Sequence, residues 1–508
     1  MDGTSTKSIA LPLILSLVLI VGMFLGFQLA RKQPQELNTK SEKESLDDLV
    51  SLIEKKYVDS ISKEKLLQDG IDGILSNLDP HTVYINKEDL PRSDEELEGS
   101  IYGIGIEYYI SNDTATISYV LPQGPSASKN FKPGDQIITI KNDTVAGKKL
   151  SQNTISKKIK GQKQNSISIG VKHLNQSFET ITVQRDYVNL PSVYSFLDTY
   201  NKTAYIQIQL FSENTYAEFY DELITLKSKK IDKLIIDVRN NPGGYMDAAT
   251  DILDELVAGK QLLVSTKSNS KKTSYYASKN GLFEKGKIAV LINENAASAS
   301  EILAGTLQDL KRATIIGAPS YGKGLVQEQF DLPNGAAIRI TTARYYLPSG
   351  RNIQRAYDHG RDAYYVDHLK KTSYQHDTSN KNTQTNGIVP DLFQSDDTSF
   401  YQIEHSYFEQ NIMEQVAQHY FLKQKEKPKD LQDFLQQSDL NNECKILLQE
   451  HLEAKHLKPM TTLSNKAQTI LLNVTKAHIA KLFFGQQAYY QVLIPKDPVY
   501  LKALRALQ

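Results

Sequence analysis

Ser298 and Lys323 are the two residues whose types and spacing offer chemistry in this chain. Ser298 ends a run of small residues that begins at Asn293, and an apolar helical pattern follows it. Lys323 is flanked by two glycines and followed by apolar residues. A serine hydroxyl becomes a good nucleophile when a base accepts its proton, and an amine can do so once desolvation lowers its pKa. The pair therefore indicates a hydrolase, with Gln327 available to orient the amine.

The same residues also allow structural interpretations. Ser298 and Glu301 have the spacing of a capping box, in which the serine accepts from a backbone N–H and the glutamate reaches back. Lysines beside glycine are commonly solvated. His81 is an alternative base for a Ser-His enzyme, although a turn histidine after proline is more often structural. Spacing alone leaves these alternatives open.

A second loop offers what acyl transfer also requires. Residues 234–238 form a short apolar run typical of a buried strand, residues 239–244 form a turn, and a helical pattern begins at Met246. Backbone amides at such a turn can face a developing oxyanion, which makes Gly243 and Gly244 candidates. A plain strand-to-helix turn is the alternative. The chain carries no phosphate-loop signature, so nucleotide binding is disfavoured.

Several segments together resemble the C-terminal processing peptidases, also called tail-specific proteases. The matching segments are residues 78–84, 234–244, 298–301, 320–327, 341–351 and 387–391. The resemblance extends from about residue 45 to residue 391. It is specific because the motifs occur together, including Gly-Lys-Gly-Leu-Val-Gln at the end of the fourth segment.

The resemblance implies a serine–lysine dyad. It assigns Ser298, rather than Ser300, as the nucleophile and Lys323 as the general base. It also implies that Gln327 orients the lysine and that the Ala299 amide is the partner of the two glycines in the oxyanion site.

Composition limits the other functions that this chain can have. With 508 residues, several domains and a large core are expected. Lys and Arg total 59, as do Asp and Glu, so net charge gives no electrostatic argument for a nucleic-acid partner. The single Cys444 excludes an intrachain disulfide and a cysteine zinc cluster. No His-Glu-x-x-His pair is present. We therefore expect no metal and no cofactor.

The N-terminus carries an apolar stretch at residues 9–30. At about 1.5 Å per residue it is long enough to cross a bilayer core of roughly 30 Å. No small-x-small cleavage site follows it, which favours an uncleaved anchor over a signal peptide and makes residues 1–32 a cytoplasmic stub and anchor. The positive charges conflict with this orientation, because Arg31 and Lys32 follow the span and only Lys7 precedes it. The resemblance implies an inner (cytoplasmic) membrane protein whose catalytic body faces the periplasm or cell exterior.

Residues 33–187 contain two smaller predicted units. Residues 33–98 read as a linker, polar over 33–43, followed by two amphipathic helices. Residues 99–187 have short alternating strands with glycine turns and resemble a PDZ domain, which binds an extended peptide as an added strand. The predicted loop for the terminal carboxylate consists of Tyr102, Gly103, Ile104, Gly105 and Ile106.

The remaining chain reads as a core followed by helices. Residues 188–395 alternate strand and helix, which predicts an α/β protease core, crotonase-like by the family resemblance. Within it, residues 367–386 are polar and predict a surface insertion. Residues 396–508 predict a helical C-terminal domain. The fold class is therefore α/β multidomain, with a membrane helix, a small helical region and a PDZ-like β-rich domain before the core.

The function that these features predict is a membrane-anchored, extracytoplasmic bacterial serine endopeptidase of the cell envelope. Its expected partners are protein or peptide substrates with free C-termini, the membrane, and a second copy of the chain or an accessory adaptor. Two alternatives remain at this point. A non-catalytic PDZ scaffold binds peptide C-termini without cleaving them, and a hydrolase acts on another acyl substrate.

Overall fold

The computed structural model describes residues 18–26, 37–161, 165–278, 280–371, 387–395, 403, 405–424 and 426–508. The chain divides into two compact units, residues 1–78 and 79–508, and each is described by itself. The second unit holds the residues predicted to carry out chemistry.

The first unit contains the helices α2 and α3 and a helical stretch at residues 18–26. Helix α2 spans Leu37–Lys56 and helix α3 spans Lys63–Leu75. The Ser62 hydroxyl caps α3 by accepting from the Lys65 N–H at 3.2 Å. The predicted polar linker at residues 33–43 is wrong from residue 37 onward, because α2 begins there. Its Lys and Glu residues have good helix propensity even without an apolar period.

The predicted membrane anchor falls largely outside the described residues. Of residues 9–30, only 18–26 are described, and they are helical with exposed side chains. Among the described helices, none combines the length and the apolar character that crossing a bilayer requires. The anchor remains a prediction.

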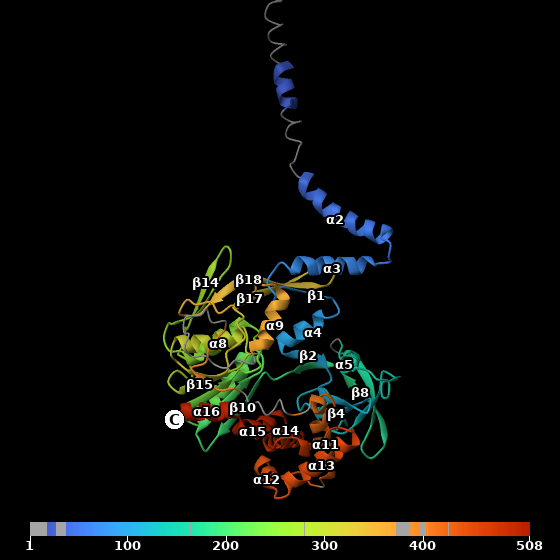
Figure 1. Ribbon diagram of the computed structural model, residues 1–508, viewed down its shortest axis with the longest axis vertical. Coiled ribbons are helices and arrows are strands. Elements are labelled where there is room, and N and C mark those ends of the chain that lie inside the picture. Colours follow the sequence, from blue (N-terminus) through green and yellow to red (C-terminus); the bar gives the residue numbers. More distant parts are fainter. Residues whose placement is uncertain are drawn as a thin grey trace, which may run out of the picture. The chain divides into compact units, whose positions relative to one another are not determined.

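The β-rich subdomain of the second unit is an antiparallel sheet with one covering helix, α5 (Gln152–Ile159) (Figure 1). The sheet order is β3-β4-β5-β7-β8, and β6 pairs with β5. The strands are β3 (Ile106–Ser111), β4 (Thr114–Val120), β5 (Gln136–Ile140), β6 (Asp143–Thr144), β7 (Ser166–Lys172) and β8 (Phe178–Gln184). Alternating isoleucines and valines from these strands form a core of their own, since successive side chains point to opposite faces. A separate strand pair, β2 (Ser100–Gly103) with β9 (Asp186–Asn189), joins this subdomain to the core.

The α/β core is built on a second sheet of order β10-β11-β12-β15-β16-β19. Its strands are β10 (Val193–Asp198), β11 (Thr203–Ile208), β12 (Lys233–Asp237), β15 (Lys287–Ile292), β16 (Thr314–Gly317) and β19 (Leu392–Phe393). All neighbours are parallel except β10 and β11. Both faces of such a sheet must be covered, which explains the near-continuous apolar runs in its central strands. The predicted α/β core is confirmed.

Different helices cover the two faces of this sheet. Helices α6 (Thr215–Ser228), α7 (Met246–Leu256) and α8 (Ala299–Asp309) bury their apolar residues in the largest core of the molecule. The final helix, α16 (Pro498–Ala506), packs on the opposite face (Figure 1). The Tyr500 hydroxyl donates to Asp198 at 3.0 Å. The end of the chain therefore belongs to the core and not to a separate helical domain that begins at residue 396.

A third sheet contains the strand that follows Lys323, the residue predicted to be the general base. It has the order β1-β18-β13-β14, and β17 pairs with β18. Its strands are β1 (Val83–Ile85), β13 (Leu262–Lys267), β14 (Lys272–Tyr276), β17 (Leu325–Asp331) and β18 (Ala337–Tyr346). Helices α4 (Leu90–Glu98) and α9 (Arg361–Lys371) complete this part of the unit. Residues 367–371 of the predicted surface insertion are the end of α9, and residues 372–386 lie outside the described residues.

Most of the C-terminal region is helical, as predicted. It contains α10 (His405–Glu409), α11 (Ile412–Lys423), α12 (Leu431–Gln436), α13 (Leu440–Ala454), α14 (Asn465–Phe484) and α15 (Gln486–Leu493). Short 3₁₀ turns occur at Met460–Thr462 and Ile494–Lys496. The helices α10 to α15 share one hydrophobic core, in which Cys444 is fully buried.

Candidate active site

Ser298 occupies a strained turn between β15 and α8. It is the N-cap of α8 and has φ +54° and ψ −112°, a conformation that costs a non-glycine residue about 1–3 kcal/mol. The backbone of Gly243 lies directly beside it, because a Cβ added to Gly243 would come within 2.7 Å of the Ser298 Cβ. Strain of this kind persists only where neighbouring contacts hold the backbone in place, as they do at many functional sites.

The buried carboxylate of Glu301 provides those contacts. One of its oxygens accepts from the backbone N–H of Ser298 at 2.9 Å and of Lys323 at 2.8 Å. The other accepts from the Gly322 N–H at 2.7 Å and from the Ser320 hydroxyl at 2.5 Å. Burial raises the pKa of this carboxyl, and the four donors oppose that shift. A single side chain therefore connects the backbone of the predicted nucleophile to that of the predicted base.

Lys323 enters the site just before β17 begins. Its ammonium donates to Gln327 Oε1 at 2.7 Å, and Gln327 Nε2 donates to the His81 carbonyl at 2.5 Å. Desolvation, followed by the nearby positive charge of Arg339, lowers the pKa of Lys323 to about 8. At pH 7, about a tenth of such a group is the neutral amine that can accept a proton.

His81 has a structural position here. Its Nε2 is 2.9 Å from the Tyr364 hydroxyl, and its ring packs edge-on against Tyr321 and Tyr364. Desolvation, and then the charge of Lys323, lowers the pKa of His81 to about 4, so the ring is neutral near pH 7. The backbone carbonyl of His81 accepts from Gln327, which in turn accepts from Lys323. These contacts argue against the Ser-His alternative.

Ser300 differs from Ser298 in its surroundings. Ser300 is fully buried, and its hydroxyl donates to the Asn241 carbonyl at 3.0 Å. The same carbonyl accepts from the Ala297 N–H at 3.0 Å. Ser298 is only partly buried. The hydroxyl of Ser300 thus ties α8 to the neighbouring turn, whereas Ser298 lies at the accessible end of the helix.

The glycine turn predicted for the oxyanion lies against the start of α8. Gly243 and Gly244 have φ +108° and +130°, and a Cβ on Gly244 would come within 2.1 Å of the Phe211 carbonyl oxygen. The Gly243 N–H donates to Asn241 Oδ1 at 2.9 Å, which occupies one of the predicted donors. A Cβ on Gly243 would also lie 3.1 Å from the Ala299 nitrogen, so the turn and the start of α8 are in direct contact.

The predicted carboxylate loop has a mixed structure. Tyr102 and Gly103 pair with β9 in the β2 strand, and Ile104 is buried in the β-rich core. Gly105 has φ +72° at the turn, and Ile106 begins β3. The five residues therefore pass from one sheet into another, and Ile106 lines a cavity.

The role of Glu301 is the main feature that sequence reasoning missed. The capping-box spacing identified the residue but indicated only a bond to Ser298. Its bonds to Gly322 and Lys323 span more than twenty residues of chain and have no local sequence signal. Arg355 was also missed. Its guanidinium is buried and stacks on the rings of Tyr321, at 4.7 Å, and Tyr364, at 3.8 Å.

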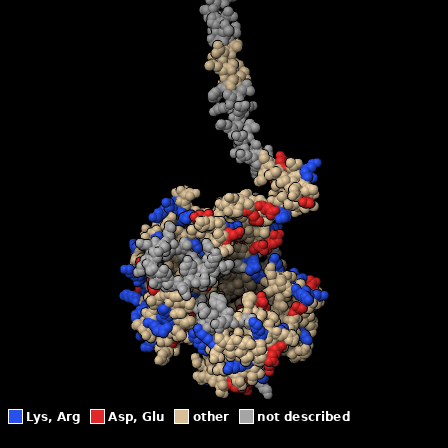
Figure 2. All heavy atoms as spheres, viewed as in Figure 1, with Lys and Arg blue, Asp and Glu red and all other residues tan. Residues whose placement is uncertain are grey.

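Figure 2 shows both basic and acidic side chains on the face of the second unit in view, in keeping with the equal numbers of the two kinds in the sequence. Within the described ranges, no group of three or more His, Cys, Asp or Glu side chains is arranged to hold a metal ion.

Comparisons with known proteins identify the family to which this chain is similar. The profile of Peptidase family S41 matches residues 202–359, and the profile of the activating protease CtpB N-terminal domain matches residues 24–89. The chain is 31% identical over 319 residues to the carboxy-terminal processing protease CtpB of Bacillus subtilis. The aligned region covers 61% of this chain and 65% of that protein. It is 31% identical over 326 residues to a carboxy-terminal-processing protease of Bartonella bacilliformis, covering 63% and 74%. Among solved structures, the photosystem II D1 C-terminal processing protease matches with 24% identity and a TM-score of 0.37, covering 68% and 92%.

Proposed function

Because this chain belongs to peptidase family S41, we propose that it is a serine endopeptidase that cleaves protein substrates recognised through their C-terminal tails. Ser298 is the nucleophile, Lys323 the general base and Gln327 the residue that positions the amine. The observation that carries the proposal is the buried Glu301 carboxylate, which accepts hydrogen bonds from the backbone amides of both Ser298 and Lys323.

In the proposed reaction, the neutral Lys323 amine accepts the Ser298 proton as Oγ attacks the scissile carbonyl carbon. The Gly244 and Ala299 amides stabilise the resulting oxyanion, since the Gly243 N–H already donates to Asn241. The Lys323 ammonium then protonates the leaving amine as the C–N bond breaks, which leaves an acyl ester on Ser298. A water molecule deprotonated by the same amine hydrolyses the ester and frees the serine.

The β-rich subdomain between β2 and β9 has the proposed role of a PDZ-type recognition domain. Its strand β3 pairs with β4, and among the described residues no strand pairs with the other edge of β3. An open edge is where an extended peptide adds as a further strand. In the proposed function, residues 9–30 anchor the chain in the membrane and the catalytic unit lies outside the cytoplasm. The substrates are protein tails, and a second copy of the chain or an adaptor is a further partner.

The test uses the full chain in detergent and a peptide that carries a free, apolar C-terminal tail. We expect the wild type to cleave the peptide, and we expect Ser298→Ala to bind it with unchanged affinity but not to cleave it. Binding without cleavage by the wild type, under conditions from pH 6 to pH 10, would instead establish a non-catalytic peptide-binding scaffold.

A further inference from the structure

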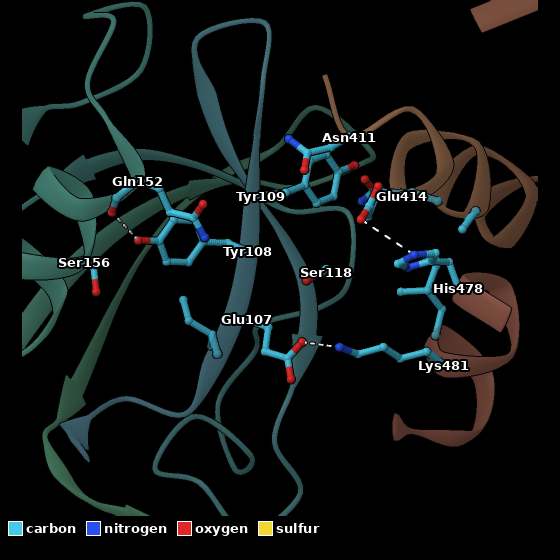
Figure 3. Close-up of a pocket in the computed structure, with 14 residues that line it drawn as sticks. Glu107, Tyr108, Tyr109, Ser118, Gln152, Ser156, Asn411, Glu414, His478 and Lys481 are labelled. Carbon is cyan, nitrogen blue, oxygen red and sulfur yellow. Dashed lines mark hydrogen bonds and ion pairs between the residues drawn. The ribbon is translucent and has the colours of Figure 1, made fainter. Parts of the chain in front are cut away.

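A cavity lies between the β-rich subdomain and the helical C-terminal region. Its volume is about 420 Å³, and it runs along strand β3. Residues 106–109 of β3 line it together with α5 on one side and the helices α11 and α14 on the other (Figure 3). The open edge of β3 therefore lies in a groove with two walls, and the second wall comes from a part of the chain more than 300 residues away.

The two walls face opposite sides of β3. The Tyr108 hydroxyl donates to the Gln152 carbonyl of α5 at 3.0 Å. The neighbouring Glu107 pairs with Lys481 of α14 at 2.5 Å, as the dashed lines in Figure 3 show. Successive side chains of a strand point to opposite faces, so β3 contacts α5 and the C-terminal helices alternately. A peptide strand added to β3 would present its own side chains in the same alternation.

The second wall contains a carboxylate oxygen with no hydrogen-bond partner among the described residues. Glu414, in the first turn of α11, has its Oε1 3.6 Å from His478 Nε2 of α14. Its Oε2 is buried and accepts no hydrogen bond from the described residues. Burial raises the pKa of Glu414, and burial lowers the pKa of His478 to about 4, so the histidine is neutral near pH 7. A buried carboxylate oxygen without a donor is destabilised, and a donor from a ligand would relieve this.

We infer that α11 and α14 form the second wall of the tail-binding groove and contact every second residue of the substrate tail. Glu414 selects a tail side chain that donates hydrogen bonds, such as Lys or Arg. The inference rests on the proposed function, since it assumes that tails bind along β3. The inference gives the C-terminal region a role in substrate binding, whereas the proposed catalytic residues all lie outside that region. The occupant is an extended segment of substrate with a free C-terminus.

The first test measures affinities of the full-length Ser298→Ala protein for a series of labelled tail peptides. One lysine is moved a single position at a time through an otherwise apolar tail that ends in a free carboxylate. We expect the affinity to alternate along the tail with a period of two. Peptides with lysine at positions that face the second wall should bind about tenfold more tightly than peptides with lysine at the positions between them. Glu414→Gln should remove this preference. Ser156→Ala, in the α5 wall, is the matched control and should preserve the preference.

A second test does not depend on substitutions in the walls. Peptides with a benzophenone side chain at successive positions are photo-crosslinked to the same protein and mapped by mass spectrometry. We expect crosslinks to alternate between residues 152–159 and the helices α11 and α14. Crosslinks confined to the β-rich subdomain at every position, or a lysine preference that survives Glu414→Gln, would overturn the inference. The proposed function would still be supported in that case if the wild type cleaved tailed peptides. Failure to bind or cleave any tail would overturn both.

Discussion

The Lys323 ammonium donates a hydrogen bond of 2.7 Å to Gln327 Oε1, across four residues that include the start of β17. A β-bulge between Val326 and Gln327 shifts the register of β17 against β18 at this point. Lys323 lies two residues before this strand begins, and Gln327 is the third residue of the strand. Its amide donates to the His81 carbonyl, so the orientation of the Lys323 ammonium depends on a backbone group far away in sequence.

Replacement of the proposed nucleophile should abolish activity without loss of the fold. In Ser298→Ala we expect hydrolysis to fall by several orders of magnitude, because the proposed mechanism forms the acyl ester on the Ser298 hydroxyl. The thermal unfolding temperature should change little, since alanine must adopt the same strained backbone conformation and only the hydroxyl is lost. Ser300→Ala is the control. It should retain activity and lose about 1 kcal/mol of stability with its buried hydrogen bond. Activity that survives in Ser298→Ala and disappears in Ser300→Ala would reverse the assignment.

The proposed base should give the reaction a characteristic pH dependence. Activity requires neutral Lys323, and its pKa is lowered to about 8. The value of kcat/KM should therefore rise as pH increases through about 8 and level off above it. Lys323→Arg should be inactive from pH 6 to pH 10, because a guanidinium stays protonated. Near-normal turnover in this variant would exclude Lys323 as the base.

Gln327 offers a test that separates orientation from charge. Gln327→Glu places a carboxylate beside the ammonium, which favours the charged form and should shift the pH profile to higher pH by about one unit or more. Gln327→Leu removes the hydrogen bond without adding charge, so it should lower kcat and leave the midpoint close to 8. Both profiles are measured with one peptide substrate. Identical midpoints in the glutamate variant and the wild type would show that this side chain does not contact the base during catalysis.

Glu301 should be required for both the stability and the geometry of the site. Glu301→Gln replaces one acceptor oxygen with an N–H₂ group that faces two donors. We expect a loss of about 2–4 kcal/mol in urea unfolding and a large drop in kcat. Ser320→Ala removes only one of the four donors and is the matched control, with a smaller loss of stability. Equal stability of Glu301→Gln and wild type would contradict the role assigned to this carboxylate.

The sequence predicted the local parts of the site better than their connections. The strands at β11, β12 and β15 and the helix α8 follow from apolar periods, and the family resemblance is confirmed by the comparisons. The dyad assignment itself remains a prediction. Local patterns cannot show that Glu301 bonds to Gly322 and Lys323, because those contacts depend on how β15, β16 and β17 are arranged.

Two errors have similar physical causes. The polar residues 37–43 were predicted as a linker because they lack an apolar period, but their helix propensity is sufficient in α2. The helical, mixed-charge pattern of residues 396–508 predicts one helical C-terminal domain. The last helix of this range, α16, instead covers the second face of the parallel sheet, with Tyr500 bonded to Asp198 and Asp497 paired with Arg239 at 2.8 Å. An amphipathic period shows that a helix has a buried face but not which surface covers it.

The last prediction concerns the free end of the substrate. If the β-rich subdomain binds tails as an added strand, the terminal carboxylate is held by backbone amides near the turn that precedes β3. Two peptides that differ only in a free or an amidated C-terminus should then differ in affinity for the full-length Ser298→Ala protein, with the free acid bound about tenfold more tightly or better. The wild type should show the same ratio in kcat/KM at low substrate concentration. A scrambled tail with a free carboxylate controls for charge alone. Equal binding and equal cleavage of the free and amidated peptides would remove tail recognition from the function of this protein, and would leave an endopeptidase that selects its substrates by sequence around the scissile bond.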